Sequence, residues 1–263
     1  MPDPRSVQSM FGRIAGRYDL LNRLLSAGID QRWRRAAVGL VADRLGGDEH
    51  LAGARGVDFC CGTGDLALAF RRAGARVAGF DFTPEMLPLA RDKGAGSGAG
   101  AAGTFLRGDA MAAPAVDGGA DFASVSFGIR NVADRLRCLE EMARVVRPRG
   151  VVLVLEFTMP PGAILGRLYR LYFTRILPTV GRLVSKDDDA YSYLPRTVLA
   201  WPDPDAFQAE FEAAGLVDCG FRRLTRGIAC LHWGRVPELA GGAREVAAPD
   251  PERRSEGPRG GEA

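Results

Sequence analysis

The sequence predicts an α/β fold in which a mostly parallel β-sheet is covered by helices. Two observations support this prediction. From Val57 onward, short β-rich runs alternate with helical stretches, and a glycine turn follows the first run. Alternation of this kind is typical of parallel sheets covered by helices. The chain has 263 residues, of which 46% are hydrophobic, so it is long enough to bury such a core.

The individual elements follow from this alternation. Strands are expected at Val57–Phe59, Arg76–Phe80, Asp121–Ser126 and Val151–Phe157, with another near Phe105. Helices are expected at Leu66–Ala73 and Arg135–Arg147. The segment Gly94–Gly103 is nearly all Gly and Ala, which predicts a flexible loop.

Three additions surround this core. Residues 1–50 are expected to form an N-terminal helical cap, because apolar residues recur there at three- and four-residue steps. The main domain is expected at residues 51–238, with a helical insertion at 159–200. Residues 239–263 are rich in proline, glycine and charge, and we expect them to be disordered.

Composition narrows the classes of function. The formal net charge is only +3, so the dense basic surface typical of nucleic-acid binding is not expected. The five cysteines lack zinc or redox spacings, which predicts no metal site and a reduced setting. With neither a signal-peptide pattern nor a spanning apolar run, we expect a cytoplasmic protein. Contact with the inner face of the cell membrane and a homo-oligomeric state both stay open.

A glycine turn gives the first chemical signal. Val57–Phe59 leads through Cys60 and Cys61 into Gly62, Thr63 and Gly64, and a helix follows. Glycines allow a ligand to lie close to the backbone and to a helix N-terminus. A tight strand–helix turn without a ligand is the alternative interpretation.

Acidic residues around this turn indicate the kind of ligand. Asp81 ends the next apolar run, where it can accept hydrogen bonds from two ribose hydroxyls. The dinucleotide motif has a third glycine where this chain has Ala67, although alanine is sometimes tolerated there. Asp58 and Asp65 flank the turn and would repel a pyrophosphate while suiting an ammonium group. Asp109, after the strand near Phe105, is placed to accept from an adenine amino group.

The run from Asp58 to Asp65 resembles the first motif of class I S-adenosylmethionine (SAM) methyltransferases. A more specific stretch, Ser126–Val132 (SFGIRNV), resembles the signature of the ubiquinone/menaquinone biosynthesis C-methyltransferases. The resemblance covers most of the chain from Val7 to Gly234. Further matching stretches include Phe11-x-x-Ile14-Ala15-x-x-Tyr18-Asp19-x-x-Asn22, Leu155-Glu156-Phe157, Asp189-Ala190-Tyr191-x-Tyr193-Leu194 and Thr225-x-Gly227-Ile228-Ala229-x-Leu231-His232-x-Gly234. Cys60 departs from the pattern, since Ala or Gly is more usual there.

This resemblance implies a Rossmann-like class I fold with a mostly parallel seven-stranded sheet and helices on both faces. It implies SAM as the cofactor and C-methylation of a polyprenylated quinol ring as the reaction. The residues expected around the cofactor are Asp58, Gly62, Thr63, Gly64, Asp81, Phe82, Asp109, Ala110 and Ser126.

Arg130 and Asn131 are the candidate catalytic residues. They follow the strand Asp121–Ser126, at the carboxyl edge where parallel sheets bind ligands. Methyl transfer to carbon needs a ring made electron-rich by loss of a hydroxyl proton. We expect Arg130 to stabilise the developing phenolate, directly or through a water, and Asn131 to orient the ring oxygen. Alternatively, Arg130 pairs with a neighbouring carboxylate for structure alone.

Candidate substrate residues are Tyr18, Asp19, Tyr172 and Tyr191. Tyr18 and Asp19 are expected to close over the site, or else to act as a core aromatic and a helix cap. Apolar residues and arginines are interleaved between Ala163 and Val184, so this segment is expected to contact a lipid surface or cover the prenyl chain. A helix packed on the core is the alternative. His232, in an apolar strand, is more simply structural.

Several functions stay open at this point. The preferred acceptor is demethylmenaquinol, and a benzoquinol or another small aromatic acceptor is the alternative, because fold does not fix substrate. A cofactor-binding scaffold subunit without catalysis is a second class, and an NAD-dependent dehydrogenase is a third.

Overall fold

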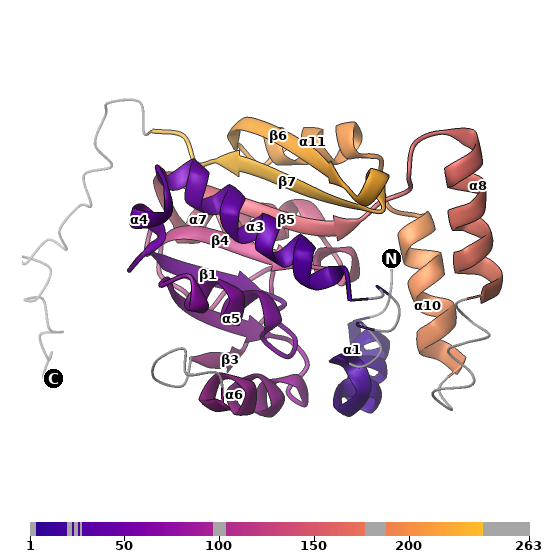
Figure 1. Ribbon diagram of the computed structural model, residues 1–263. Coiled ribbons are helices and arrows are strands. Elements are labelled where there is room, and N and C mark those ends of the chain that lie inside the picture. The colour runs from indigo at the N-terminus through magenta and orange to yellow at the C-terminus, as the bar shows by residue number, and fades with distance from the viewer. Residues whose placement is uncertain are drawn as a thin grey trace, which may run out of the picture.

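The structure is a computed structural model that describes residues 4–19, 23, 26, 28–96, 104–176 and 188–238. A seven-stranded sheet runs through its middle (Figure 1). The strands are β1 (Arg55–Phe59), β2 (Arg76–Asp81), β3 (Phe105–Arg107), β4 (Ala120–Ser126), β5 (Val146–Phe157), β6 (Val217–Leu224) and β7 (Ala229–Arg235). Their order is β3-β2-β1-β4-β5-β7-β6. Neighbours from β3 to β5 pair in parallel, whereas β7 is antiparallel to both β5 and β6.

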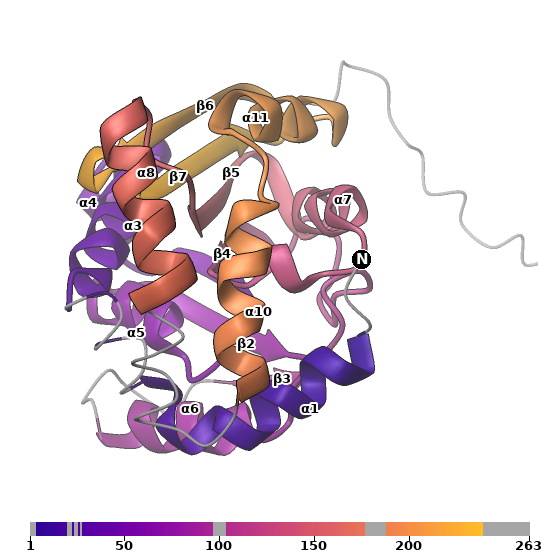
Figure 2. The ribbon, with the colours of Figure 1, turned by 90° about the vertical axis from the view of Figure 1, so that its right-hand side faces the viewer.

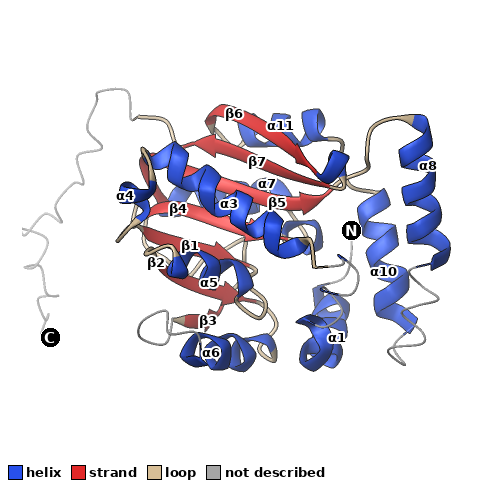
Figure 3. Cartoon of the chain, in the orientation of Figure 1, coloured by secondary structure: helices blue, strands red, loops and turns tan. Residues whose placement is uncertain are grey.

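Helices cover both faces of this sheet, as the coloured cartoon in Figure 3 shows. One hydrophobic cluster joins the sheet to α3 (Asp30–Leu45), the short α4 (Asp48–Leu51), α5 (Asp65–Arg72) and α6 (Met86–Gly96). A second cluster joins the opposite face to α7 (Arg135–Val145) and α11 (Pro204–Ala213). In β5, Val151–Leu155 is a continuous apolar run because both faces of the sheet are buried there. The predicted seven-stranded, mostly parallel sheet with helices on both faces is confirmed.

Three further helices lie at the end of the sheet where the parallel strands terminate. They are α1 (Pro4–Ile14), α8 (Ala163–Leu171) and α10 (Asp188–Leu199). Figure 2 looks onto this end and shows α1, α8 and α10 in front of the strand ends. The other helical segments are short: the 3-10 helices η1 (Ala15–Arg17), η2 (Ile129–Asn131) and η4 (Thr225–Gly227), and the π-helix η3 (Tyr172–Ile176). The strand order reverses between β1 and β4, and sheets of this kind bind ligands at the carboxyl ends of the strands beside such a reversal.

Several predicted element ends differ from the structure; β1, for example, begins at Arg55 and β5 at Val146. The helix expected to reach Arg147 ends at Val145, and Val146 already pairs with Ala120 of β4. Pro148 explains this, because the residue before a proline is disfavoured in helical conformation. The loop expected from Gly94 begins later, since α6 continues to Gly96 with Gly94 buried. Residues 97–103, 177–187 and 239–263 lie outside the described residues, and with them the predicted C-terminal disorder.

Within the described residues, no helix has the length and apolar character needed to cross a bilayer.

Candidate functional site

A cavity of about 390 Å³ lies where β1, β2 and β4 end. Its size is within the range typical of small-molecule sites. The walls come from the strand ends, from the loop after β3 and from the N-terminal helix α1. The lining residues are Arg5, Val7, Phe11, Tyr18, Cys60, Gly62, Phe80, Asp81, Phe82, Thr83, Met86, Gly108, Asp109, Ala110, Met111, Ser126, Phe127, Gly128, Asn131, Val132 and Ala133.

The glycine turn after β1 reaches the cavity at Gly62, which is one of the lining residues. Gly64 precedes α5 with a left-handed φ of 83°, which an L side chain rarely adopts. A Cβ at this position would lie 3.0 Å from Cζ of Phe105 and 3.1 Å from Cβ of Ala90. The turn therefore needs glycine at residue 64 to bring the strand, the helix and the cavity together. Gly64 itself is not one of the residues that line the cavity, whereas Gly62 is.

Asp81 is the central acidic residue of the cavity. It ends β2, is 9% exposed and lines the cavity wall. Its Oδ2 accepts from the Gly62 N–H at 2.8 Å, and its Oδ1 accepts from the Thr83 N–H at 2.8 Å. Burial raises the pKa of this carboxyl, and the two amide donors oppose the rise. Asp81 thus holds the glycine turn in place.

The predicted residues Phe82, Asp109, Ala110 and Ser126 also line the cavity. Asp109 follows β3, and its Oδ1 accepts from the Met111 N–H at 2.9 Å. This bond fixes a tight turn at the wall. The structure brings these four residues to one cavity from the loops after β2 and β3 and from the end of β4, as their positions along successive strands predict.

Asp58 lies deeper than the cavity wall. Its carboxylate is 1% exposed and its Oδ1 accepts from the Ser124 hydroxyl at 2.7 Å. Burial raises its pKa to about 7, although Ser124 and the Ala67 amide oppose the rise. The position of Asp58 is therefore that of a buried support beneath the glycine turn.

Thr63 belongs to a charged network beside the turn. Its hydroxyl donates to Asp19 Oδ1 at 2.6 Å and accepts from Lys93 Nζ at 2.8 Å. The same ammonium contacts Asp19 and Asp65, each at 2.6 Å. Lys93 thereby ties the N-terminal segment to the glycine turn. Lys93 was not predicted as a site residue, because nothing in the local sequence pattern shows that α6 reaches this loop.

The N-terminal segment closes one side of the cavity. Arg5, Phe11 and Tyr18 line it, and Gln8 Nε2 donates to the Phe82 carbonyl oxygen at 2.9 Å. The rings of Phe11 and Tyr18 meet edge to face, with centroids 6.0 Å apart. The structure therefore places Tyr18 and Asp19 against the site, the former at the cavity and the latter on the glycine turn.

The two candidate catalytic residues take different positions. Asn131 lines the cavity, and its Oδ1 accepts from the Tyr193 hydroxyl of α10 at 3.0 Å. Arg130 is directed toward β5, with its side chain 6% exposed. Its Nη1 donates to Glu156 Oε1 at 2.5 Å and to the Phe127 carbonyl oxygen at 2.7 Å. This ion pair is the carboxylate pairing that stood as the alternative for Arg130.

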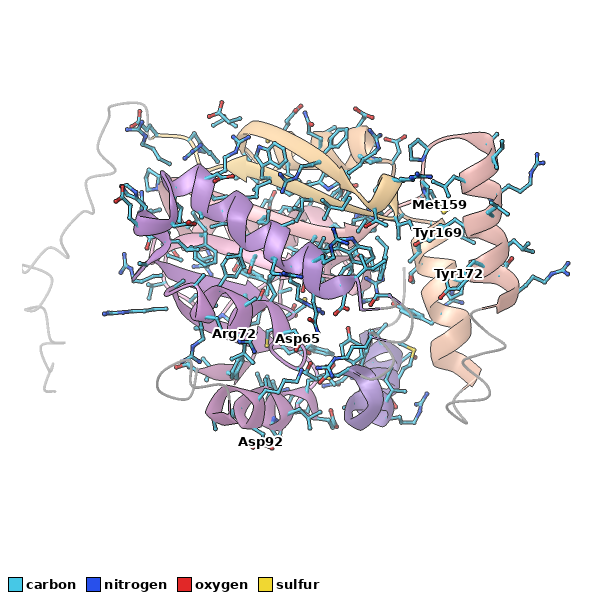
Figure 4. All side chains as sticks on the ribbon, in the orientation of Figure 1. Asp65, Arg72, Asp92, Met159, Tyr169 and Tyr172 are labelled. Atoms are coloured by element: carbon cyan, nitrogen blue, oxygen red, sulfur yellow. The ribbon has the colours of Figure 1, made fainter. Side chains whose placement is uncertain are left out.

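The remaining tyrosine candidates lie in the insertion. Tyr172 is half-buried and packs beside Tyr169 and Val198, and Figure 4 labels both tyrosines between α8 and the rest of the molecule. The side chain of Tyr191 lies outside the described residues. His232 is fully buried, with its ring near Phe207 at 4.9 Å between centroids, and burial lowers its pKa to about 4. This buried position agrees with the structural position predicted for His232 from the sequence.

The cavity suits a nucleoside bearing a charged sulfur. The carboxylate of Asp81 at the end of β2 lines the cavity, together with Phe82, Met86, Asp109 and Ala110. Among the described residues, no cluster of His, Cys, Asp or Glu has the grouping of a metal site. Fold and site together define the class I SAM-dependent methyltransferases.

Solved structures support the fold. A SAM-dependent methyltransferase from Thermotoga maritima, described as a possible histamine N-methyltransferase, is similar with a TM-score of 0.59 and 18% identity over 87% of this chain and 98% of that one. The [4+2]-cyclase SpnF is similar with a TM-score of 0.62 and 16% identity over 90% and 97%. Because a methyltransferase and a cyclase share it, the fold alone does not decide the reaction.

Sequence comparison is more specific. A model of the ubiE/COQ5 methyltransferase family matches residues 2–236, and the chain belongs to this family. The demethylmenaquinone methyltransferase of Thermus thermophilus is 46% identical over 230 residues, 87% of this chain and 100% of the relative. The ubiquinone/menaquinone biosynthesis C-methyltransferase UbiE of Geobacter sulfurreducens is 41% identical over 231 residues, 87% of each chain. The predicted family, the methyltransferase activity and SAM as cofactor are confirmed.

Proposed function

We propose that the protein methylates a ring carbon of a polyprenylated quinol, and that its acceptor is demethylmenaquinol. The observation that carries this proposal is the 46% identity to a demethylmenaquinone methyltransferase along that relative's whole length. Relatives named for both ubiquinone and menaquinone biosynthesis keep a benzoquinol acceptor as the alternative. The stretch Ser126–Val132 contributes most of its residues to the cavity wall, which supports an acceptor site beside the cofactor.

In this proposal the cofactor lies across the glycine turn. Asp81 binds the ribose hydroxyls, while Asp109, Ala110 and Phe82 surround the adenine. Gly62 leaves room for the backbone to approach the methionine portion. When bound, SAM supplies a methyl group on a positively charged sulfur, which an electron-rich carbon accepts.

The protein's own groups prepare the ring. Asn131 lines the cavity and is held by Tyr193, so its amide is fixed to orient a ring oxygen. Arg130, which precedes Asn131 in the chain, is proposed to provide a positive charge for the oxygen that loses its proton. Tyr18 and residues of α1 line one side of the cavity. Catalysis in this account is positioning together with stabilisation of the ring oxyanion.

The insertion is proposed to hold the prenyl chain at an anionic bilayer. Ile164, Leu168 and Leu171 follow one face of α8 and are 79%, 58% and 48% exposed. The basic residues Arg167 and Arg170 are exposed on the same helix, and no acidic residue occurs between 157 and 186. An exposed apolar stripe flanked by arginines matches the chemistry of an anionic membrane surface.

A transfer assay tests the function. Purified protein is given SAM labelled in its methyl carbon, with reduced demethylmenaquinol and the corresponding benzoquinol in separate reactions. We expect label in the naphthoquinol ring, at a higher kcat/KM than for the benzoquinol. Tight SAM binding without transfer to either quinol would favour a scaffold subunit instead. Arg130→Ala and Arg130→Lys are measured alongside for turnover and cofactor affinity, and unchanged turnover would end the role assigned to Arg130.

A flotation assay tests the membrane contact. The double variant Ile164→Ser, Leu168→Ser is compared with Val116→Ser, which changes an exposed apolar residue on a loop remote from α8. We expect wild-type protein and V116S to float with phosphatidylglycerol vesicles, and the double variant to stay behind. Equal flotation of all three proteins, or equal flotation on neutral phosphatidylcholine vesicles, would contradict the proposed contact.

A further inference from the structure

Glu156 is a fully buried carboxylate next to the cavity wall. It follows Leu155, whose strand neighbour is Ser126 of the cavity wall, and the Phe127 N–H donates to the Leu155 carbonyl oxygen at 2.8 Å. The Glu156 side chain is 0% exposed. Glu156 lies within β5, directly after the Ser126–Leu155 pair, and therefore places a carboxyl group at the carboxyl edge of the sheet.

This carboxylate is only partly satisfied. Its Oε1 accepts from Arg130 Nη1 at 2.5 Å and from the Phe157 N–H at 2.8 Å. Within the described part of the chain, its buried Oε2 and the buried Nε of Arg130 have no hydrogen-bond partner. Buried ion pairs add little net stability unless all their polar atoms are satisfied. An incompletely satisfied pair beside a cavity points instead to a role in function.

The charges of the pair act on two tyrosines of the insertion. Burial raises the pKa values of Tyr169 and Tyr193, with the charge of Glu156 adding to the rise and that of Arg130 opposing it. Tyr193 in turn holds Asn131, which lines the cavity. The pair thus lies between the cofactor cavity and the insertion.

The surroundings supply few other charges. The pKa of Glu156 itself is raised by burial, against the opposing charge of Arg130. Tyr169 of α8 and Tyr193 of α10 are the titratable groups on which the charges of the pair act. Tyr172 of η3 acts in turn on Tyr169, and Arg196 of α10 acts on Tyr193. Cys230 is the neighbour of Glu156 in the β5–β7 register. Arg130 is the cation in direct contact with Glu156.

We propose that Glu156 is a positioning residue for methyl transfer: it fixes the guanidinium of Arg130 and offsets its charge, and so sets the pH at which the acceptor's ring hydroxyl ionises. This inference rests on the proposed function. In the ionisation, the ring O–H bond breaks, the electron pair stays on oxygen and the proton leaves to water. The charge on the ring oxygen then faces a guanidinium that is held still and partly neutralised. Removing the Glu156 charge leaves Arg130 uncompensated, which favours the ionised ring.

The test measures the ionisation of a bound phenol directly. A chromogenic naphthol, 4-nitro-1-naphthol, is titrated spectrophotometrically in complex with the protein and S-adenosylhomocysteine. In Glu156→Gln we expect the midpoint of the bound naphthol about one pH unit lower than in the wild type, because the charge of Arg130 is then no longer offset and an opposite charge at close range lowers the pKa of an acid by about one to three units. Glu156→Asp keeps the charge and is expected to stay near the wild type. With demethylmenaquinol, the rising limb of kcat against pH should move in the same direction as the naphthol midpoint.

Glu141→Gln is the matched control. Glu141 is also a buried carboxylate, 3% exposed, that pairs with an arginine, Arg144, at 2.8 Å, but it lies on α7. We expect this variant to leave the naphthol midpoint unchanged. If Glu156→Gln does not fold, Arg130→Gln serves in its place and should move the midpoint to higher pH.

Three results would overturn the inference: a wild-type midpoint in Glu156→Gln (or in Arg130→Gln, where Glu156→Gln does not fold), an equal shift in Glu141→Gln, or no naphthol binding by the wild type. The naphthol titration needs no methyl transfer, so it separates this inference from the proposed function. A shift without quinol methylation would sink the proposed function alone, and quinol methylation without a shift would sink only the role of Glu156.

Discussion

Replacing Asp58 with asparagine should change the pH dependence of stability in a defined direction. Burial raises the pKa of this carboxyl from 3.8 to about 7 in the folded protein. The rise is about three units, and at about 1.4 kcal/mol per unit it corresponds to about 4 kcal/mol. Below pH 4 both states are protonated and there is no penalty. As the pH rises from 4 to 7, Asp58 ionises in the unfolded chain before it does so in the folded protein. The free energy of unfolding therefore falls by up to about 4 kcal/mol over this range and stays at the lower value above pH 7.

The D58N variant carries no charge at this position and escapes the loss. At pH 4 it should be less stable than the wild type by about 1 kcal/mol, because the amide replaces one acceptor oxygen of Asp58. By pH 8 the order should reverse, with the variant more stable by about 3 kcal/mol. Urea unfolding followed by tryptophan fluorescence at several pH values gives the free energy of unfolding for both proteins.

Asp121→Asn is the control for this measurement. Burial would raise the pKa of Asp121, but the hydrogen bonds from Arg147 and the Arg55 amide outweigh it, so the pKa is lowered. Its contribution is therefore present above pH 4 and lost only as the pH falls below that value. Between pH 5 and 9 the difference between D121N and the wild type should be constant. A difference between D58N and the wild type that is equally flat over this range would refute the reasoning about Asp58.

Three further predictions follow from the cavity. Gly64→Ala should lower the free energy of unfolding by about 1–2 kcal/mol, because residue 64 has a positive φ and no space for a Cβ. The control Gly16→Ala, at a position where a Cβ meets no neighbouring atom, should leave the urea midpoint unchanged. Asp81→Asn should weaken SAM binding about 10- to 100-fold in calorimetry, the loss expected for hydrogen bonds to a charged group, and an unchanged Kd would remove Asp81 from the sugar site. Tyr193→Phe removes the hydrogen bond that holds Asn131, so kcat should fall about fivefold with the SAM Kd unchanged; equal kcat values would show that Asn131 needs no support.

The sheet was predictable because its signal is local. The run Val151–Leu155, for example, is apolar at every position, which is typical of a strand that is buried on both faces. The positions of Asp81, Asp109 and Ser126 after successive strands place them at one edge, so their meeting at one cavity needed no long-range information. Element ends were less predictable, as Val145 and Gly96 show.

What the sequence did not reveal are pairs made between distant segments. Glu156 was visible within a matching stretch, but its contact with Arg130 joins residues 26 positions apart on neighbouring strand ends. Lys93 contacts Asp19 across 74 positions, and no periodicity records that distance. Burial was also not predicted for Asp58. From its charge, Asp58 was expected beside an ammonium group, whereas its carboxylate is buried in the structure. The roles of these residues in binding stay predictions.

The quinones of a strain that lacks this protein test the central claim most directly. Mass analysis should show a quinone lighter by one CH₂ group than menaquinone, and the wild-type gene should restore the full mass while the Asp81→Asn variant should restore much less. Fully methylated menaquinone at normal levels in the deletion strain would contradict the assignment of demethylmenaquinol as the acceptor.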